Sequence, residues 1–536
     1  PVTSSVDRYY DDAGYFLGCL VGQTIGWGVE MDSLSTRPPD PDIVGLKWKK
    51  IWKNRLKNTP PYVPIWLSHQ EKDKYWLQGT ISKNYNLIKC PVFTTGGWAD
   101  CWPNTVGRLV KNLNTNVKGI SGPWGHNYSC FAKPGPQIDF LNECVKWWDK
   151  WLKNKNNGVE KDPKITAFIR KSMKPNPLGV DRPGYWIKEN SWPPKSNVNK
   201  NFYFNQNQLI SKKSSSKNNF VTFSSPQNTG YGSGEYMPWF VAGDGPELPT
   251  DQKIDDIKSL TFETNVLNED FKILGSPILK LKVSSDQNCG MVAARICEIN
   301  QDGSSNLVTF GIINFAQRKG REKNLKVTKN KFYEIFINLN DTGYEFTKGN
   351  KIRLSLSTSY WPMAWPLPKN FRLKLKLDEC LLKLPVNLLK KEAKNLVKFK
   401  KPVSAEFRKT IQVKKPLKRF RKIIEDKEKD ESIFEIFHDA SWIGPGLLKI
   451  LDNGMTLQSF VNQKFIIKNN NPLSASANYK HEHIMIKNKF NVRIVVSTNI
   501  SCDQKYFYYD YFLQAFNNNK KYYTKKINKK ILRKSF

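Results

Sequence analysis

Two stretches decide the fold of this chain: CPVFTTGGWADCWPN at residues 90–104 and VKGISGPWGHNY at residues 117–128. Each starts as a short apolar run and closes on glycine, which is typical of a buried parallel strand. Residues 105–114 lie between them with the spacing of an amphipathic helix, whose apolar face comprises Val106, Leu109, Val110 and Leu113. Strand, helix and strand in this order predict a βαβ unit.

A third segment follows at residues 138–154, IDFLNECVKWWDKWLKN, and its spacing predicts another amphipathic helix. The positions expected along one packed side are Leu141, Cys144, Val145, Trp148, Trp151 and Leu152. Together with the βαβ unit, this helix indicates that residues 87–160 are the last part of a doubly wound α/β domain.

The regions on either side of this unit have different patterns. Residues 1–86 form short helical patterns rich in tryptophan, interrupted by the pair Pro60-Pro61, which cannot continue a helix. Residues 161–370 contain short strand-like runs separated by turn signals, as in a β-sandwich or jelly roll. Residues 371–536 are lysine-rich and continue the β pattern. The sequence therefore predicts an α/β part followed by an all-β part.

Length and composition exclude several classes of protein. A chain of 536 residues is expected to form three or four domains, and 39% hydrophobic residues exclude global disorder. The nine cysteines are scattered without a Cys-x-x-Cys pair, which favours reduced thiols in a cytoplasm. No run approaches the ~18 apolar residues of a membrane helix, and the N-terminal stretch PVTSSVDRYY has no signal-peptide pattern. We therefore expect a cytoplasmic protein without membrane contact.

The net charge of +37 is concentrated towards the C-terminus, since residues 371–536 hold 36 basic and 15 acidic side chains. Most of the basic residues are lysines, and no zinc finger, RNP sequence, basic zipper or arginine-rich stripe is present. This pattern favours a solvated lysine-rich surface over nucleic-acid binding. If a polyanion site exists, residues 390–430 are the expected place for it.

Two side chains at the ends of the predicted strands are suited to acid–base chemistry. Asp100 follows the first strand and His126 follows the second, at the edge where open α/β sheets place their ligand sites. A carboxylate that orients an imidazole makes a general base, and Asp100 before His126 fits the chain order serine, acid, histidine. The alternative for Asp100 is a helix N-cap, although Asn104 and Thr105 are better placed for that role.

The other four histidines have simpler interpretations. His69 lies in an amphipathic helical pattern and is expected to pack or cap, and His438 is expected at the surface beside a charged stretch. His481 and His483 share one face of a strand, but two ligands without a nearby carboxylate or cysteine make a weak zinc pattern. We therefore predict no metal and no organic cofactor.

A nucleophile for this pair is not evident in the sequence, because no Gly-x-Ser-x-Gly elbow is present. Ser121 belongs to the strand that leads to His126, Ser233 has the wrong glycine spacing, and Cys19 follows no predicted strand. The chain also begins without methionine. We therefore expect that the catalytic serine precedes Pro1.

Several long motifs in order make the chain resemble the CocE/NonD family of serine hydrolases, which is related to X-prolyl dipeptidyl peptidases, cocaine esterase and α-amino-acid ester hydrolases. The motifs include DRYYDDAGYFLGCL, STRPPDPDIVG, WLSHQEKDKYWLQGT, CPVFTTGGWADCWPN, KGISGPWGHNY, LTFETNVLNEDFKILGSP and SYWPMAWP. They cover nearly the whole chain. The resemblance implies the C-terminal portion of an α/β-hydrolase with a helical cap at residues 1–86, then a jelly roll and a further β-rich region.

The resemblance also implies roles for residues. Asp100 would be the acid of the triad, His126 its base, and Trp102 would contact the acyl group, whereas the serine and the oxyanion donors would lie before Pro1. The expected partner is a small ester, amide or short peptide, with the choice among them open, and a homo-oligomer is compatible with the sequence. The 536 residues alone would be inactive. The alternative is a catalytically inactive binding protein whose basic C-terminal region takes an acidic partner.

Overall fold

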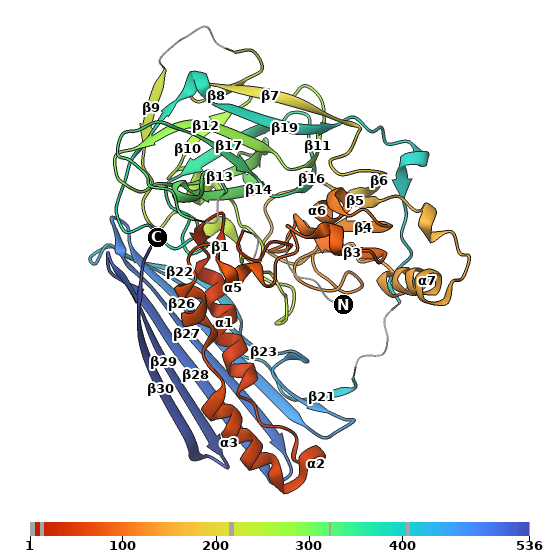
Figure 1. Ribbon diagram of the computed structural model, residues 1–536, viewed down its shortest axis with the longest axis vertical. Helices are drawn as coiled ribbons and strands as arrows, with labels where there is room; N and C mark the ends of the chain where they lie inside the picture. The colour runs from red at the N-terminus through yellow and green to blue at the C-terminus, as the bar shows by residue number, and fades with distance from the viewer. Residues whose placement is uncertain (1–5, 11–14, 214–218, 321–322, 404–407, 535–536) are drawn as a thin grey trace.

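The computed structural model describes residues 6–10, 15–213, 219–320, 323–403 and 408–534. Residues 1–5 and 11–14, which belong to the predicted cap, lie outside the described residues. The chain arranges itself as a helical region, a small parallel sheet, a large β region and a long separate sheet (Figure 1). No helix in the described ranges combines the length and the hydropathy needed to cross a membrane.

The predicted βαβ unit is present. It consists of β3 (Val92–Gly97), α6 (Thr105–Asn112) and β4 (Val117–Gly122), and the two strands pair in parallel from Val92↔Val117 to Gly97↔Gly122. The apolar face of α6 packs on these strands, because Val106, Leu109 and Val110 are buried. All six residues of β4 are buried, whereas only Thr94 and Gly97 of β3 are buried. β3 is therefore the outer strand of the pair.

The predicted third segment forms α7 (Phe140–Lys153), but its buried face differs from the prediction. The structure buries Cys144 and Trp147, and Trp147 contacts Phe93 of β3 with ring centroids 5.9 Å apart. Four of the positions expected to be packed are exposed: Leu141, Val145, Trp148 and Leu152. The helix lies on the sheet through one narrow side, and the described residues do not cover the rest of its apolar surface.

The parallel sheet continues into the jelly roll without a break. β4 pairs in parallel with β5 (Ile165–Lys171), and β5 pairs antiparallel with β6 (Gly184–Glu189). The remaining strands of this region are β7 (Asn197–Asn205), β8 (Gln208–Ile210), β9 (Phe220–Phe223), β10 (Leu260–Glu263), β11 (Phe271–Gly275), β12 (Ile278–Ser285), β13 (Met291–Ile299), β14 (Ser305–Asn314), β15 (Tyr333–Asn338), β16 (Thr342–Phe346), β17 (Lys351–Ser357), β18 (Leu373–Lys376), β19 (Leu381–Asn387) and β20 (Leu396–Val397). β13 pairs with β14 and β17 and is buried along its whole length, so it forms the centre of the sandwich.

Residues 15–87 form the helical region expected as a cap. Its elements are β1 (Tyr15–Phe16), β2 (Cys19–Leu20), α1 (Gly22–Ser35), α2 (Pro41–Val44), α3 (Trp48–Asn58), α4 (Tyr62–Ser68) and α5 (Lys74–Leu77). The indole rings of Trp52, Trp66 and Trp76 are buried and belong to one continuous apolar core. These helices are therefore packed around tryptophans, as the sequence predicts.

A second, ten-stranded sheet follows the jelly roll and packs against the cap helices (Figure 1). Its strands are β21 (Thr410–Lys414), β22 (Phe420–Asp426), β23 (Glu431–Ser441), β24 (Gly444–Pro445), β25 (Leu447–Ile450), β26 (Thr456–Lys468), β27 (Asn471–Lys487), β28 (Phe490–Cys502), β29 (Tyr506–Asn517) and β30 (Lys520–Leu532). Tyr479 of β27 donates a hydrogen bond to the Gly22 carbonyl of α1 at 2.7 Å. Trp52 stacks on Tyr522 of β30 with ring centroids 4.7 Å apart.

The division between the two sheets differs from the sequence-based boundary at 370/371. β18 pairs with β9 and β12, β19 pairs with β7, β11 and β12, and β20 pairs with β6. These strands complete the jelly roll, although they lie in the lysine-rich part of the sequence. The second sheet begins at β21 (Thr410), so the composition changes about forty residues before the strand pairing does.

Six of the 36 basic residues of the C-terminal region lie on the last strand. β30 pairs with β29 and forms an edge of the second sheet, and it carries Lys520, Lys521, Lys525, Lys526, Lys529 and Lys530. Lysines along an edge strand oppose pairing with other chains. The short remaining helices are η1 (Gly45–Lys47), η2 (Tyr85–Leu87), η3 (Val159–Lys161), η4 (Tyr231–Ser233), α8 (Lys253–Asp256), η5 (Phe315–Gln317), η6 (Leu377–Glu379) and η7 (Ala393–Asn395).

Candidate active site

Asp100 and His126 meet at the carboxyl edge of the parallel strands, as the sequence predicts. The Nδ1 atom of His126 lies 3.0 Å from Oδ1 of Asp100, and the two side chains are 20% and 13% exposed. The same Oδ1 accepts the Cys101 N–H at 2.6 Å. With a proton on Nδ1, the imidazole donates to the carboxylate and directs the lone pair of Nε2 outward.

Main-chain hydrogen bonds hold the two loops together. The N–H of Trp98 donates to the Gly122 carbonyl at 2.9 Å, and the N–H of Ala99 donates to the Trp124 carbonyl at 3.1 Å. The N–H of His126 donates to the Pro238 carbonyl at 2.7 Å, which ties the histidine loop to the jelly-roll region. The position of the imidazole is therefore fixed by backbone contacts on both sides.

Two indole rings contact the imidazole. Trp102, which the sequence singles out, contacts His126 edge-on with centroids 4.8 Å apart. Trp239 also contacts the imidazole, with ring centroids 4.8 Å apart, and was missed because it lies far along the chain in a segment without a motif. Glu247 fixes that segment, since its Oε2 accepts the N–H groups of Trp239 and Phe240 at 2.5 and 2.7 Å.

A cavity of about 140 Å³ adjoins His126. Its walls come from three parts of the fold: the α1 helix, the loops around Trp102 and Trp239, and the second sheet. The polar and aromatic lining residues are Gln23, Trp27, Glu30, Trp102, His126, Glu235, Tyr236, Trp239, Glu247, His438, Ser441, Trp442, Ser459, Gln463, His481 and His483. A ligand here would contact His126 and the second sheet together.

Three glutamates line this cavity. Glu30 and Glu235 have raised pKa values, and Glu247 is paired with an arginine. Burial raises the pKa of Glu30 to about 7. Burial and the nearby Glu247 raise the pKa of Glu235 to about 8. Arg419 donates to Glu247 at 2.6 Å and also lies 3.9 Å from Glu235. The carboxyl groups beside His126 therefore hold protons near neutral pH or are balanced by arginine.

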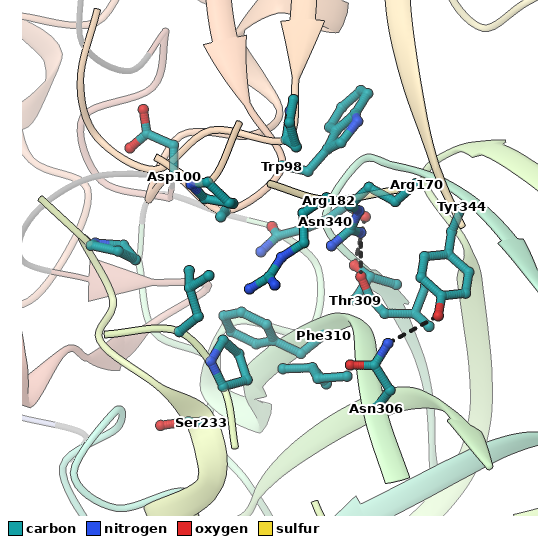
Figure 2. A pocket seen from close by; sticks show the side chains of 18 of the residues that line it. Trp98, Asp100, Arg170, Arg182, Ser233, Asn306, Thr309, Phe310, Asn340 and Tyr344 are labelled. Atoms are coloured by element: carbon teal, nitrogen blue, oxygen red, sulfur yellow. Dashed lines mark hydrogen bonds between the residues drawn. The ribbon is translucent and has the colours of Figure 1, made fainter. Parts of the chain in front are cut away.

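A second cavity of about 110 Å³ is lined in part by Asp100 (Figure 2). Arg170, Arg182 and Tyr344 line it, and Figure 2 shows Arg170 and Tyr344 on one side and Asp100 on the other with its carboxylate turned away. Arg170 donates to the Val308 carbonyl at 2.9 Å, and Arg182 donates to a carbonyl of its own loop at 2.8 Å. Burial lowers the pKa of both arginines to about 10. These guanidinium groups brace main-chain segments beneath the site.

The serine and cysteine candidates of the sequence do not join His126. Ser121 is buried within β4, Cys19 is buried in β2, and Ser233 donates to the Gly234 carbonyl at 3.1 Å. Across the described ranges, the side-chain hydrogen bond recorded for the His126 ring is the one to Asp100. None of the three candidates is therefore placed as a nucleophile.

The remaining histidines divide into surface and buried groups. His69 bonds Asp73 at 2.6 Å and stacks on Tyr75, which agrees with a packing role. His481 and His483 share one buried face of β27, as expected. His438 was expected at the surface, but it lines the cavity, because β23 is paired on both sides and this face is turned towards it.

Asp100, Cys101 and His126 also form the one group in the described part of the chain with the composition of a metal site, with ligand atoms within 4.8 Å of one another. The sequence argument missed Cys101 because it considered only the strand-end acid and base. Oδ1 of Asp100 and Nδ1 of His126 are at hydrogen-bond distance from each other, so these two ligand atoms are already engaged. The arrangement fits an acid–histidine pair better than a tetrahedral metal site.

An acid and a histidine at the ends of adjacent parallel strands, beneath a helical cap, define the class as α/β-hydrolase. Residues 1–128 match the family model of the X-Pro dipeptidyl-peptidase (S15 family), and residues 157–401 match that of the X-Pro dipeptidyl-peptidase C-terminal non-catalytic domain. The chain belongs to the CocE/NonD family of X-Pro dipeptidyl-peptidase-like hydrolases. Residues 402–536 lie outside both matched regions.

Known relatives agree with this assignment. Cocaine esterase from Rhodococcus sp. (strain MB1 Bresler) is 20% identical over 321 residues, 55% of this chain and 53% of the relative. The chain thus spans about half of that relative's length. Three solved structures share the fold at 14% identity. A CocE/NonD family hydrolase from Staphylococcus aureus has a TM-score of 0.50, covering 71% of this chain and 66% of that chain. An aminopeptidase from a marine sediment Thaumarchaeota archaeon has a TM-score of 0.55, covering 72% of this chain and 71% of that chain, and an α-amino acid ester hydrolase has a TM-score of 0.52, covering 71% of each chain.

Proposed function

We propose that this chain forms the acid–base half of a serine hydrolase that cleaves esters or amides through an acyl-enzyme. The observation that carries the proposal is the 3.0 Å hydrogen bond between His126 Nδ1 and Asp100 Oδ1 at the carboxyl ends of β4 and β3. Asp100 orients the ring and stabilises its charged form, and Nε2 of His126 accepts a proton.

The reaction follows from this orientation. A serine hydroxyl attacks the carbonyl carbon of the substrate while Nε2 of His126 takes its proton, and the same nitrogen returns the proton to the leaving group. Water then attacks the acyl-enzyme with His126 again acting as the base, which frees the acid and regenerates the serine. These steps balance without a metal or an organic cofactor.

The attacking serine is proposed to lie outside these 536 residues. The sequence has no Gly-x-Ser-x-Gly elbow, and the described serines have no recorded hydrogen bond to the His126 ring. Among the described strands the register of β3 is with β4, so the opposite side of β3 is the place where a further strand would add. In α/β-hydrolases the serine precedes the acid and the histidine in chain order.

The proposed substrate is a small ester, an amide or a short peptide. Trp102 and Trp239 both contact His126 and line the cavity, so they supply flat apolar surface for an acyl group. The names of the relatives cover both chemistries, since they include a cocaine esterase, an α-amino acid ester hydrolase and an aminopeptidase. Nine free cysteines support a reducing cytoplasm as the location.

The test is to express the chain together with the genomic sequence that precedes the codon of Pro1. We expect the longer protein to react with a fluorophosphonate at one serine and to hydrolyse aryl esters or aminoacyl-prolyl amides. The 536 residues alone are expected to do neither. Labelling that survives with full activity in His126→Ala would contradict the proposed role of the histidine.

The alternative, a binding protein with a basic C-terminal region, rests on the exposed lysines of β30 and the exposed strand β21. Binding of a polyanion through these lysines would weaken steeply with salt. Heparin retention at low salt that disappears at moderate salt would support it, and absence of retention at low salt would remove it.

A further inference from the structure

The cavity beside His126 has one wall from a part of the chain that neither family model covers. β23, β26 and β27 supply this wall, and their register sets His438 opposite Val461, and Val461 opposite His481. Directly opposed residues of an antiparallel sheet point to the same face. His438, Val461 and His481 therefore form a row across the wall, and all three line the cavity.

The facing wall is one side of α1. Gln23, Trp27 and Glu30 are four and three residues apart, which places them on one helical face. Trp102, His126 and Trp239 line the same cavity. A molecule that presents a carbonyl to His126 has its remaining atoms between α1 and the second sheet.

Two histidines of β27 differ in how their ring nitrogens are satisfied. His483 is bonded on both sides, by Ser33 Oγ at 2.8 Å and Ser459 Oγ at 2.7 Å. His481 is 1% exposed, and within the described residues neither of its ring nitrogens has a hydrogen-bond partner. Nδ1 of His438 is likewise buried and unpartnered there. A buried polar group without a partner costs about 1–3 kcal/mol, so the fold stabilises one imidazole and leaves two for a ligand.

The charge of these rings selects the kind of group they take. Burial lowers the pKa of His438 and of His481 to about 3, so both rings are neutral at pH 7. A neutral imidazole offers one N–H donor and one bare nitrogen acceptor. A carboxylate has no donor for the bare imidazole nitrogens, and an ammonium would leave each imidazole N–H unpaired. An amide group has both a C=O acceptor and an N–H donor, and it carries no charge.

We propose that the second sheet completes the substrate pocket and that His481 and His438 bind an uncharged amide group of a peptide-like substrate. The apolar part of that substrate lies between Trp27 and Trp239. The inference rests on the proposed function, because it takes the cavity beside His126 as the substrate pocket of that hydrolase. It adds the substrate class and places two specificity residues in a region beyond the family models.

Binding of four fragments of equal size to the 536-residue protein tests this without turnover. The fragments are N-benzylacetamide, 4-phenylbutan-2-one, 3-phenylpropanoate and N-benzylacetamidinium, which present an amide, a ketone, an anion and a cation on the same benzyl group. Tryptophan fluorescence reports affinity. Because the chain has five histidines, selective ¹⁵N labelling reports which ring each fragment contacts.

We expect the amide to bind about tenfold more tightly than the ketone, as two neutral hydrogen bonds allow, and to shift the His481 and His438 signals. The preference should disappear in His481→Leu and weaken in His438→Leu. His69→Gln, which changes a histidine paired with Asp73 at the surface of the cap, should keep the preference and serves as the matched control.

Equal affinities of amide and ketone in the unchanged protein would overturn the inference, as would an amide preference that survives in His481→Leu. The comparison of amide and ketone in the unchanged protein does not depend on any variant, so it tests the inference even where a variant misfolds. Failure of the proposed hydrolase activity would be a separate result, since amide binding at His481 can be present without any turnover.

Discussion

The carbonyl oxygen of Trp124 lies against the α-carbon of Gly97, so closely that a β-carbon at this position would overlap it. Gly97 ends β3 and Trp124 precedes the His126 loop, so this contact brings the acid loop and the base loop together. A side chain on residue 97 would push the two loops apart. The glycine is therefore required by the Asp100–His126 contact rather than by an unusual backbone angle.

Gly97→Ala is expected to destabilise the fold by about 1–3 kcal/mol, the range for an overpacked site, and to lengthen the Asp100–His126 contact. Thermal unfolding measures the first effect, and the nuclear magnetic resonance signals of His126 measure the second. Gly454→Ala is the control, because Gly454 has a φ of +70° but open space around it. The control should lose stability and leave the His126 signals in place. Unchanged His126 signals in Gly97→Ala would contradict this reading of the contact.

Asp100→Asn should reduce kcat of the serine-containing enzyme about 10⁴-fold, because an amide favours the wrong tautomer of the histidine. Substrate affinity should change little, since Asp100 is not among the residues that line the 140 Å³ cavity beside His126 and its carboxylate is bonded to His126. Steady-state hydrolysis of an aryl ester gives both quantities. Asp139→Asn, at the N-cap of α7, is a control of the same chemistry outside the site. A loss of less than tenfold in Asp100→Asn would count against the acid role.

Asp32 makes stability depend on pH. Burial raises the pKa of the Asp32 carboxyl to about 8. Its Oδ1 accepts the Tyr62 N–H at 3.0 Å, whereas its Oδ2 has no hydrogen-bond partner in the described residues. An unfolded aspartate loses its proton near pH 4, whereas the folded one keeps it to about pH 8. The contribution of Asp32 to the free energy of unfolding is therefore complete below pH 4 and is lost as the pH rises through 8.

Asp32→Asn should accordingly flatten the fall of the thermal midpoint between pH 5 and pH 8 and make the variant more stable than the parent at pH 8. Differential scanning calorimetry at several pH values measures this. Asp452→Asn, at an exposed position, should leave the profile unchanged. Parallel pH profiles for the parent and Asp32→Asn would refute the assignment.

Zinc should neither bind tightly nor be needed. Asp100 and His126 are hydrogen-bonded to each other, so an ion could not use both of those atoms without breaking that contact. We expect isothermal titration calorimetry with ZnCl₂ to give no stoichiometric binding, and prolonged dialysis against EDTA to leave the thermal midpoint unchanged. Stoichiometric, tight zinc binding that Cys101→Ala abolishes would instead identify the cluster as a metal centre.

The sequence was sufficient for the Asp100–His126 contact because the contact is local to one βαβ unit. Both residues follow predicted parallel strands, and parallel strands in register bring their carboxyl ends to one edge. The buried side of α7 could not be predicted in the same way. Helical periodicity says which residues share a face, and it does not say which of Trp147 and Trp148 meets a neighbouring strand.

The second sheet could be recognised as β structure but not placed. His481 and Trp239 reach the cavity only because β27 packs on α1 and because Glu247 holds the Trp239 segment. Such contacts join residues far apart in the chain, and no local pattern encodes them. His438 shows the consequence, since nearby charges suggested the surface while its place in β23 turned it to the cavity.

The most direct measurement is the tautomer of His126 in the 536-residue protein, read from ¹⁵N shifts of selectively labelled histidine. We predict that the proton sits on Nδ1, that Nε2 is bare, and that Asp100→Asn disturbs this state. His69, paired with Asp73 through the same ring atom, supplies an internal comparison that Asp100→Asn should not affect. A His126 with its proton on Nε2, or one indifferent to Asp100→Asn, would contradict the claim that Asp100 prepares this histidine to act as a base.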